Sequence, residues 1–228
     1  MLEIEKTVTP SPEQWEIVIE GMRNPKNSWD RIDSSYCEDC YGDCNDCDLY
    51  DYREGCPIDR YVLGPNDRDL ANRLVGGGPV HAKFRRMLPV HVTINAPLYW
   101  WKEFDTYKVG TVTNSCSTMH KIHDKKFTTD DFSSDHLDED AIDDLIRDIT
   151  NLNSYRVLFL ETKEKKWWWH MIQRLPTSYN QKRTVMLNYE ALANMYQWRR
   201  NHKLDEWHTF CDWIEKLPYS ELITGKEE

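Results

Sequence analysis

The sequence lacks any apolar run close to the ~20 residues that a membrane-spanning helix needs. It also lacks an excess of positive charge. Its formal net charge is −10, which argues against nonspecific binding to nucleic acid or to an anionic membrane. Residues 1–15 do not show the basic-then-apolar pattern of a signal peptide, and no internal repeat is visible. These absences predict a cytoplasmic protein, and 228 residues favour a single core.

Cysteine is scarce except in residues 33–60, which hold five of the seven cysteines among many acids and few aliphatic residues. Four thiols, each a candidate metal ligand, follow the spacing Cys37-x2-Cys40-x3-Cys44-x2-Cys47. Four thiolates suit tetrahedral zinc, although common zinc modules separate the two pairs by a dozen residues or more. Neighbouring acids such as Glu38 and Asp39 would raise the thiol pKa values and oppose a dianionic centre. An iron–sulfur cluster, disulfides or no ligand are the alternatives.

Apolar periodicity predicts the regular elements. Leu88, Val90, Val92 and Ile94 alternate with polar residues, which indicates a half-buried strand over 88–95. A second, β-branched strand is expected over 109–113. Helices are expected over 14–22, 67–75, 98–108, 138–152, 155–173, 188–200 and 205–217. The acids between Asp130 and Asp148 lie off the apolar stripe and are expected to face solvent, whereas Trp167, Trp168 and Trp169 favour core and subunit interface over base stacking.

The stretch from Leu175 to Arg199 is the most informative, and it is expected to form a loop and a helix. Eleven residues make about three helical turns, so Asn188 and Arg199 share a face with Leu192 and Met195. Amides can bind the edge of a heterocycle, and a guanidinium can polarise a pyrimidine carbonyl. The alternatives are that Asn188 is only a helix N-cap and that Arg199 is only a surface residue.

From Pro176 to Asn188, Asn194 and Arg199 the steps are 12, 6 and 5 residues, and this spacing resembles the flavin-dependent thymidylate synthases. The step from His81 to Pro97 also matches that family, and the resemblance covers residues about 66–223. It implies an α+β fold, with an antiparallel sheet flanked by helices, and a homotetramer with sites between subunits. It further implies FAD, held by His81, Asn188 and Asn194, and the pyrimidine nucleotide dUMP. Methylenetetrahydrofolate would donate the carbon and NADPH the reducing equivalents.

The family's Arg-His-Arg signature is largely missing. It falls on Thr106–Lys108 or, with one inserted residue, on Tyr107–Val109, and in the second register Asn114 and Ser117 match. Lys108, Asn114, Ser117, Arg174 and Arg199 are therefore the expected nucleotide-binding residues. A nucleotide phosphate carries about two charges at neutral pH, so losing arginines should weaken its binding strongly. No catalytic residue is assigned; Cys116 could add to a pyrimidine ring, and a small buried cysteine is the alternative.

The sequence thus predicts an N-terminal segment (1–32), a cysteine-rich acidic insert (33–60) and a domain related to these synthases (61–228). Three functions fit this organisation. The first is a diverged flavoenzyme acting on a pyrimidine nucleotide by one-carbon transfer and reduction. The second is a non-catalytic protein that binds a nucleotide-like ligand on the same scaffold. The third is an interaction protein that uses the acidic insert as its contact surface.

Overall fold

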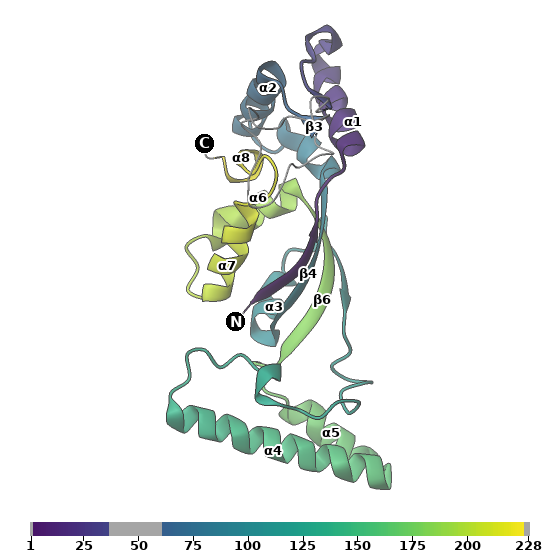
Figure 1. The fold of residues 1–228 in the computed structure, drawn as a ribbon, viewed down its shortest axis with the longest axis vertical. Helices are drawn as coiled ribbons and strands as arrows, with labels where there is room; N and C mark the ends of the chain where they lie inside the picture. The colour runs from purple at the N-terminus through teal and green to yellow at the C-terminus, as the bar shows by residue number, and fades with distance from the viewer. Residues whose placement is uncertain (1, 37–60, 226–228) are drawn as a thin grey trace, which may run out of the picture. The chain divides into compact units, whose positions relative to one another are not determined.

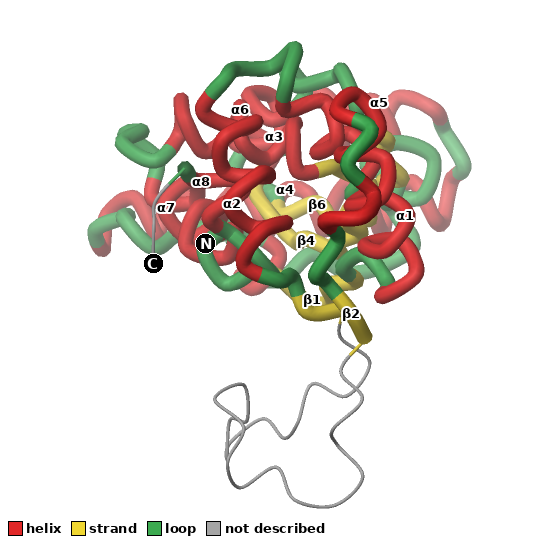
Figure 2. The backbone as a smooth tube through the Cα atoms, turned by 90° about the horizontal axis from the view of Figure 1, so that it is seen from above, coloured by secondary structure: helices red, strands yellow, loops and turns green. Residues whose placement is uncertain are grey.

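The computed structural model describes residues 2–36 and 61–225 of the chain (Figures 1 and 2). Its strands are β1 (Glu3–Val8), β2 (Ser35–Tyr36), β3 (Tyr61–Val62), β4 (Pro89–Pro97), β5 (Val112–Ser115) and β6 (Asn180–Asn188). Its α-helices are α1 (Pro12–Arg23), α2 (Pro65–Gly76), α3 (Leu98–Phe104), α4 (Glu139–Thr162), α5 (Lys165–Arg174), α6 (Tyr189–Arg199), α7 (Asp205–Ile214) and α8 (Glu221–Thr224). The chain divides into two compact units. The first comprises Met1–Thr7, Val92–Met186 and Asn201–Phe210, and the second comprises the remainder.

The predicted α+β class with an antiparallel sheet flanked by helices is confirmed. The four strands of the main sheet lie in the order β1-β4-β6-β5, and Figure 2 shows β4 between β1 and β6. The β5–β6 pair is antiparallel and runs from Val112 opposite Met186 to Ser115 opposite Arg183. Strand β4 forms where alternation predicted it, with Val92 and Ile94 buried.

Strand β6 corrects the expectation of a loop before residue 188. Gln181, Val185 and Leu187 point inward and are buried, while Lys182 and Thr184 are exposed. The period of two residues is therefore present, but polar side chains at inward positions hide it from an apolar count. Strand β5 likewise begins later than expected, at Val112 in place of Val109.

An aromatic cluster fills the core of the first unit beside the sheet. Trp100 and Trp101 on α3 are fully buried, and Trp100 contacts Phe104, Trp207 and Phe210 at ring-centroid distances of 4.8 to 5.7 Å. The indole N–H of Trp101 donates to the carbonyl oxygen of Gln181 at 2.8 Å. Since that carbonyl belongs to β6, the bond fixes α3 against the sheet. The tryptophans of this region are therefore mainly core residues.

Helix α4 is a single helix of 24 residues, which corrects the expected break near residue 153. Asn153 does not end it because its amide side chain bonds both the N–H and the carbonyl oxygen of Phe127. The turn comes at Lys163, which adopts a left-handed conformation (φ 58°). Helix α5 then packs back along the C-terminal half of α4 (Figure 1).

In the second unit, helices α1, α2, α6 and α8 surround buried aromatic and charged groups. Trp15 on α1 meets the rings of Tyr189 and Tyr219 edge-on. Asp67 on α2 is fully buried and accepts from the Nε of Arg23 at 2.6 Å and from the Oγ of Ser34 at 2.7 Å. The backbone N–H groups of Asp33 and Ser34 also donate to Asp67, each at 3.0 Å. Burial pushes the pKa of Asp67 upward, but hydrogen bonds from Ser34 and Arg23 outweigh it and hold the pKa below its usual value.

Replacing Asp67 with Asn should destabilise the protein by about 3–5 kcal/mol, because the change leaves the buried Arg23 without its countercharge. Equilibrium urea unfolding measures the effect. Asp69→Asn is the matched control on the same helix: its pair with Arg73 is more than half exposed, so a change within about 0.5 kcal/mol is expected.

The same carboxylate predicts a pH dependence. Its folded pKa lies below the unfolded value of about 3.9, so its contribution is present above that value and is lost as pH falls through the folded pKa. The wild type should therefore lose stability at acid pH more steeply than Asp67→Asn. Equal slopes below pH ~4 would contradict this assignment.

Candidate functional site

A cavity of about 260 Å³ opens where α3 leads into β5. Its lining residues are Phe104, Asp105, Tyr107, Lys108, Thr111 and Thr113. This is the segment on which the Arg-His-Arg signature falls in either register. The cavity therefore lies at the position where the resemblance predicts nucleotide contacts, although the signature side chains are absent.

Local hydrogen bonds shape the cavity wall. The hydroxyl of Thr111 donates to the carbonyl oxygen of Tyr107 at 2.6 Å, which closes the loop between them. Gly110 within that loop has a φ of 78°, a conformation that side-chain-bearing residues rarely adopt. Thr113 lies on β5 opposite the buried Val185, so its position is set by the sheet. The wall thus presents hydroxyl groups and one phenol ring on a fixed backbone.

The charges beside the cavity are divided between a neutralised pair and one exposed cation. Arg183 on β6 stacks over the Trp101 ring at 4.3 Å, its Nε donates to Gln181 at 2.9 Å, and its Nη1 donates to Asp105 at 2.7 Å. Asp105 is thereby paired, and Lys108 remains the exposed cation on the lining. Arg183 was not identified from the sequence, because its segment was expected to be a loop. The available signal was its position two residues before the buried Val185 in β6.

Asn114, Ser117 and Cys116 follow the cavity along the chain. Asn114 is exposed on β5 opposite Thr184. The Oγ of Ser117 accepts from the backbone N–H groups of Met119 and Lys121, both at 3.3 Å, so it holds a turn. Cys116 is exposed, which corrects the expectation of a buried thiol. Among these, only Lys108 from the predicted nucleotide-binding set lines the cavity.

Arg174 ends α5 and is engaged within the α4–α5 pair. Its Nη1 donates to the hydroxyl of Tyr155 at 3.2 Å, and its Nη2 lies 3.6 Å from a carboxylate oxygen of Asp148. These contacts show that the Arg174 side chain helps to hold α5 against α4. A role in phosphate binding would require Arg174 to leave or share them.

The remaining predicted residues belong to the second unit. Asn188 is the N-cap of α6, since its Oδ1 accepts from the N–H of Ala191 at 2.9 Å. The predicted stripe is confirmed for Leu192 and Met195, which are fully buried, while Arg199 is half-buried. Asn194 is exposed on another side of the helix. Asn188 thus has a structural role as a helix cap, the alternative that its position before α6 also allowed.

His81, the other expected flavin-binding residue, is exposed in the turn that follows α2. Its backbone N–H donates to Gly78 at 3.0 Å, and Gly78 has a φ of 90°. A Cβ at Gly77 would come within 3.2 Å of the His81 ring. The missing side chain at Gly77 therefore makes room for the imidazole.

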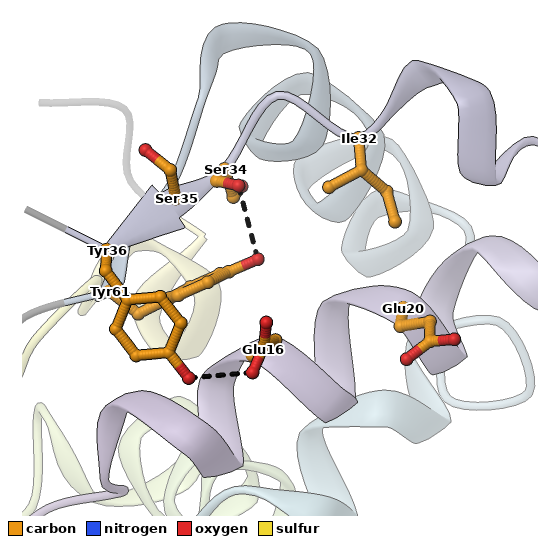
Figure 3. A pocket seen from close by; sticks show the side chains of 7 residues that line it. All are labelled: Glu16, Glu20, Ile32, Ser34, Ser35, Tyr36 and Tyr61. Atoms are coloured by element: carbon orange, nitrogen blue, oxygen red, sulfur yellow. Dashed lines mark hydrogen bonds between the residues drawn. The ribbon is translucent and has the colours of Figure 1, made fainter.

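A second cavity, of about 270 Å³, was not anticipated from the sequence (Figure 3). It is lined by Glu16, Glu20, Ile32, Ser34, Ser35, Tyr36 and Tyr61. Figure 3 shows the Tyr36 hydroxyl donating to Glu16, and this bond raises the pKa of Tyr36 to about 12. With two carboxylates and no cation on its lining, this cavity is unsuited to phosphate.

The zinc expectation receives no support from the described ranges 2–36 and 61–225, which contain no group of three or more potential metal ligands. The expected ligands Cys37, Cys40, Cys44 and Cys47 lie outside those ranges. Within the same ranges, no helix is long and apolar enough to cross a membrane.

Comparison with known proteins places the fold. No protein-family model and no curated protein sequence matches the chain. Among solved structures, it is similar to a flavin-dependent thymidylate synthase from Helicobacter pylori complexed with FAD and dUMP. The TM-score is 0.61 at 16% identity, covering 100% of this chain and 99% of that one. It is also similar to PolB, a UMP/dUMP methylase from Streptomyces cacaoi bound with 5-Br dUMP, with a TM-score of 0.54 at 13% identity and coverage of 99% and 94%. These likenesses establish a shared fold.

The two asparagines of α6 give a testable contrast. Asn188→Ala should cost about 1 kcal/mol because α6 loses its N-cap, and Asn188→Asp should retain most of the stability. Asn194→Ala on the exposed side should change the free energy of unfolding by less than about 0.5 kcal/mol. Thermal and urea unfolding measure all three, and equal effects of the two alanine variants would refute the capping role.

Proposed function

We propose that this protein is a diverged relative of the flavin-dependent thymidylate synthases that binds FAD and a dUMP-like pyrimidine nucleotide in the cytoplasm. The observation that carries the proposal is the cavity beside Lys108, on the segment where the family's signature would lie. The likeness along the whole chain to structures described as complexes with FAD and dUMP supports it. The activity proposed is one-carbon transfer and reduction toward dTMP.

The described residues fit part of such a ligand. At about 260 Å³ the cavity lies just below the range of about 300–1,000 Å³ for pockets that hold drug-sized ligands. One chain would therefore hold a ring or a phosphate-bearing portion, and the rest of a dinucleotide would need further residues. We propose that these come from other subunits of a homotetramer, with His81, Asn188 and Asn194 contacting the flavin.

Three side chains on the lining each have a defined task in this proposal. Tyr107 offers a flat face to a ring, the hydroxyl of Thr113 can bond a ring carbonyl, and Lys108 can pair with a phosphate. FAD, when bound, supplies hydride transfer. Lys108 is the cation on the lining that we propose for the nucleotide phosphate, and Arg199 is the proposed contact to the pyrimidine. Arg174 and Arg183 have partners in the structure.

The second candidate function is a non-catalytic nucleotide-binding or interaction scaffold built on the same fold. The engaged Arg174 and the missing signature favour it, because a phosphate dianion is usually held by bidentate arginines, each bond contributing about 1.5–3 kcal/mol. Such a protein would bind a nucleotide weakly or a less charged ring instead. Nothing in this alternative requires a flavin.

FAD titration followed by visible absorbance and flavin fluorescence tests the proposal. Lys108→Gln should weaken FAD or dUMP binding by about ten- to a hundredfold, because one charge-assisted bond is lost. Lys102→Gln, an exposed lysine on α3 that does not line the cavity, should leave both affinities unchanged.

Isothermal titration with dUMP and with uncharged deoxyuridine completes the test. If Lys108 holds the phosphate, Lys108→Gln should affect dUMP and leave deoxyuridine binding as it was. Absence of flavin uptake by the wild type at millimolar FAD would refute the flavoenzyme proposal. Nucleotide binding without flavin would then favour the scaffold.

A further inference from the structure

Helix α4 carries an exposed apolar flank beside the face that packs in the core. Its buried face consists of Leu145, Ile149 and Leu152, which pack in one cluster with Met171. Four further aliphatic side chains are exposed by between 36% and 46%: Ile142, Ile146, Val157 and Leu160. Two exposed apolar residues near each end of one helix exceed the scattered apolar residues of an ordinary surface and indicate a docking site.

The four exposed residues form a single stripe. At 3.6 residues per turn, the intervals of 4, 11 and 3 residues between them keep all four within about 60° of rotation around the helix axis. The buried residues Leu145 and Ile149 lie about 60° and about 20° beyond this range. The stripe therefore runs nearly the full length of α4 beside its packed face.

The stripe is also nearly symmetric about the middle of the helix. Ile142 and Leu160 lie nine residues on either side of position 151, and Ile146 and Val157 lie five and six residues from it. A second α4 that runs antiparallel would place Ile142 opposite Leu160 and Ile146 opposite Val157. This is the self-complementary pattern of a two-fold contact, in which one patch meets its own copy.

The charges along α4 are distributed unevenly, with acids in its first half and basic residues at its C-terminal end, and this distribution favours the antiparallel pairing. The first half carries the exposed acids Glu139, Asp140, Asp143 and Asp144, among which Asp144 is paired with Arg147. The C-terminal end and the start of α5 carry Arg156, Lys163, Lys165 and Lys166 beside two acids, Glu161 and Glu164. Antiparallel pairing brings each acidic half onto the basic end of the other copy, whereas parallel pairing brings like charges together.

We propose that α4 docks onto α4 of a second copy of this chain, antiparallel, around a two-fold axis near position 151. A net charge of −10 opposes indiscriminate self-association, so a contact with local charge complementarity is the kind that can form specifically. The proposal concerns the assembly that our proposed function invokes, but it requires neither flavin nor nucleotide.

Analytical ultracentrifugation of the full chain without ligand tests the contact. Ile146→Lys should reduce the mass of the assembly by at least half at a concentration where the wild type is fully associated. Ile17→Lys is the matched control, since Ile17 is a 60% exposed isoleucine on α1, and it should leave the mass unchanged. A monomeric wild type at ~100 μM, or equal effects of the two variants, would overturn the proposal.

A charge reversal tests the antiparallel register. Glu139 and Lys163 lie twelve residues either side of position 151, so each meets the other across the axis. Glu139→Lys and Lys163→Glu alone should each weaken association several-fold, and the double variant should restore it to within about twofold of wild type. A double variant that associates as weakly as the singles would overturn the register. Circular dichroism of each variant confirms that it folds.

The two proposals fail separately. A wild type that associates through α4 but takes up no FAD contradicts the flavin assignment alone. A wild type that binds FAD and whose mass is insensitive to Ile146→Lys contradicts the α4 contact alone.

Discussion

The buried carboxylate of Asp67 is the constraint on which the second unit depends. A fully buried charge is tolerated only when it is paired and hydrogen-bonded, and Asp67 meets this condition through Arg23 and Ser34. These partners come from α1 and from the chain that follows it, so one group joins two helices and the segment leading to Tyr36. The Oγ of Ser34 also accepts from the N–H of Gly64, which fixes the chain beyond β3. The acidic cavity beside Glu16 therefore has walls set by an interaction outside it.

Helices and strands were predicted correctly from the sequence where apolar residues alone set the periodic pattern. Strand β4 and helices α6 and α7 follow from aliphatic and aromatic spacing, and all three formed where expected. Strand β6 escaped because Gln181 and Arg183 occupy inward positions, made possible by bonds to Cys116, Asp105 and each other. The length of α4 escaped because Asn153 has a tertiary partner that no local rule reveals. In both cases a polar side chain satisfied by a distant group overrode the local pattern.

For the candidate site, the sequence indicated a segment but not which of its residues already have structural partners. The resemblance predicted Lys108 as a nucleotide-binding residue, and in the structure Lys108 lines the cavity between α3 and β5. It could not indicate that Arg174 and Asn188 already have structural partners, since a partner from the next helix or the same cap is not encoded in spacing. Of the predicted groups, Asn194 is exposed and Arg199 is half-buried on α6.

Charge decides between the ligands that this fold could take. Beside the cavity, the Arg183 charge is offset by Asp105, so the lining presents the single ammonium of Lys108 in a chain of net charge −10. One exposed ammonium cannot balance a phosphate dianion, whereas the phenol of Tyr107 and the hydroxyl of Thr113 can hold a neutral ring without any countercharge. In the proposed function, tight binding of a nucleotide therefore needs cations in addition to Lys108, whereas binding of a ring without a phosphate does not.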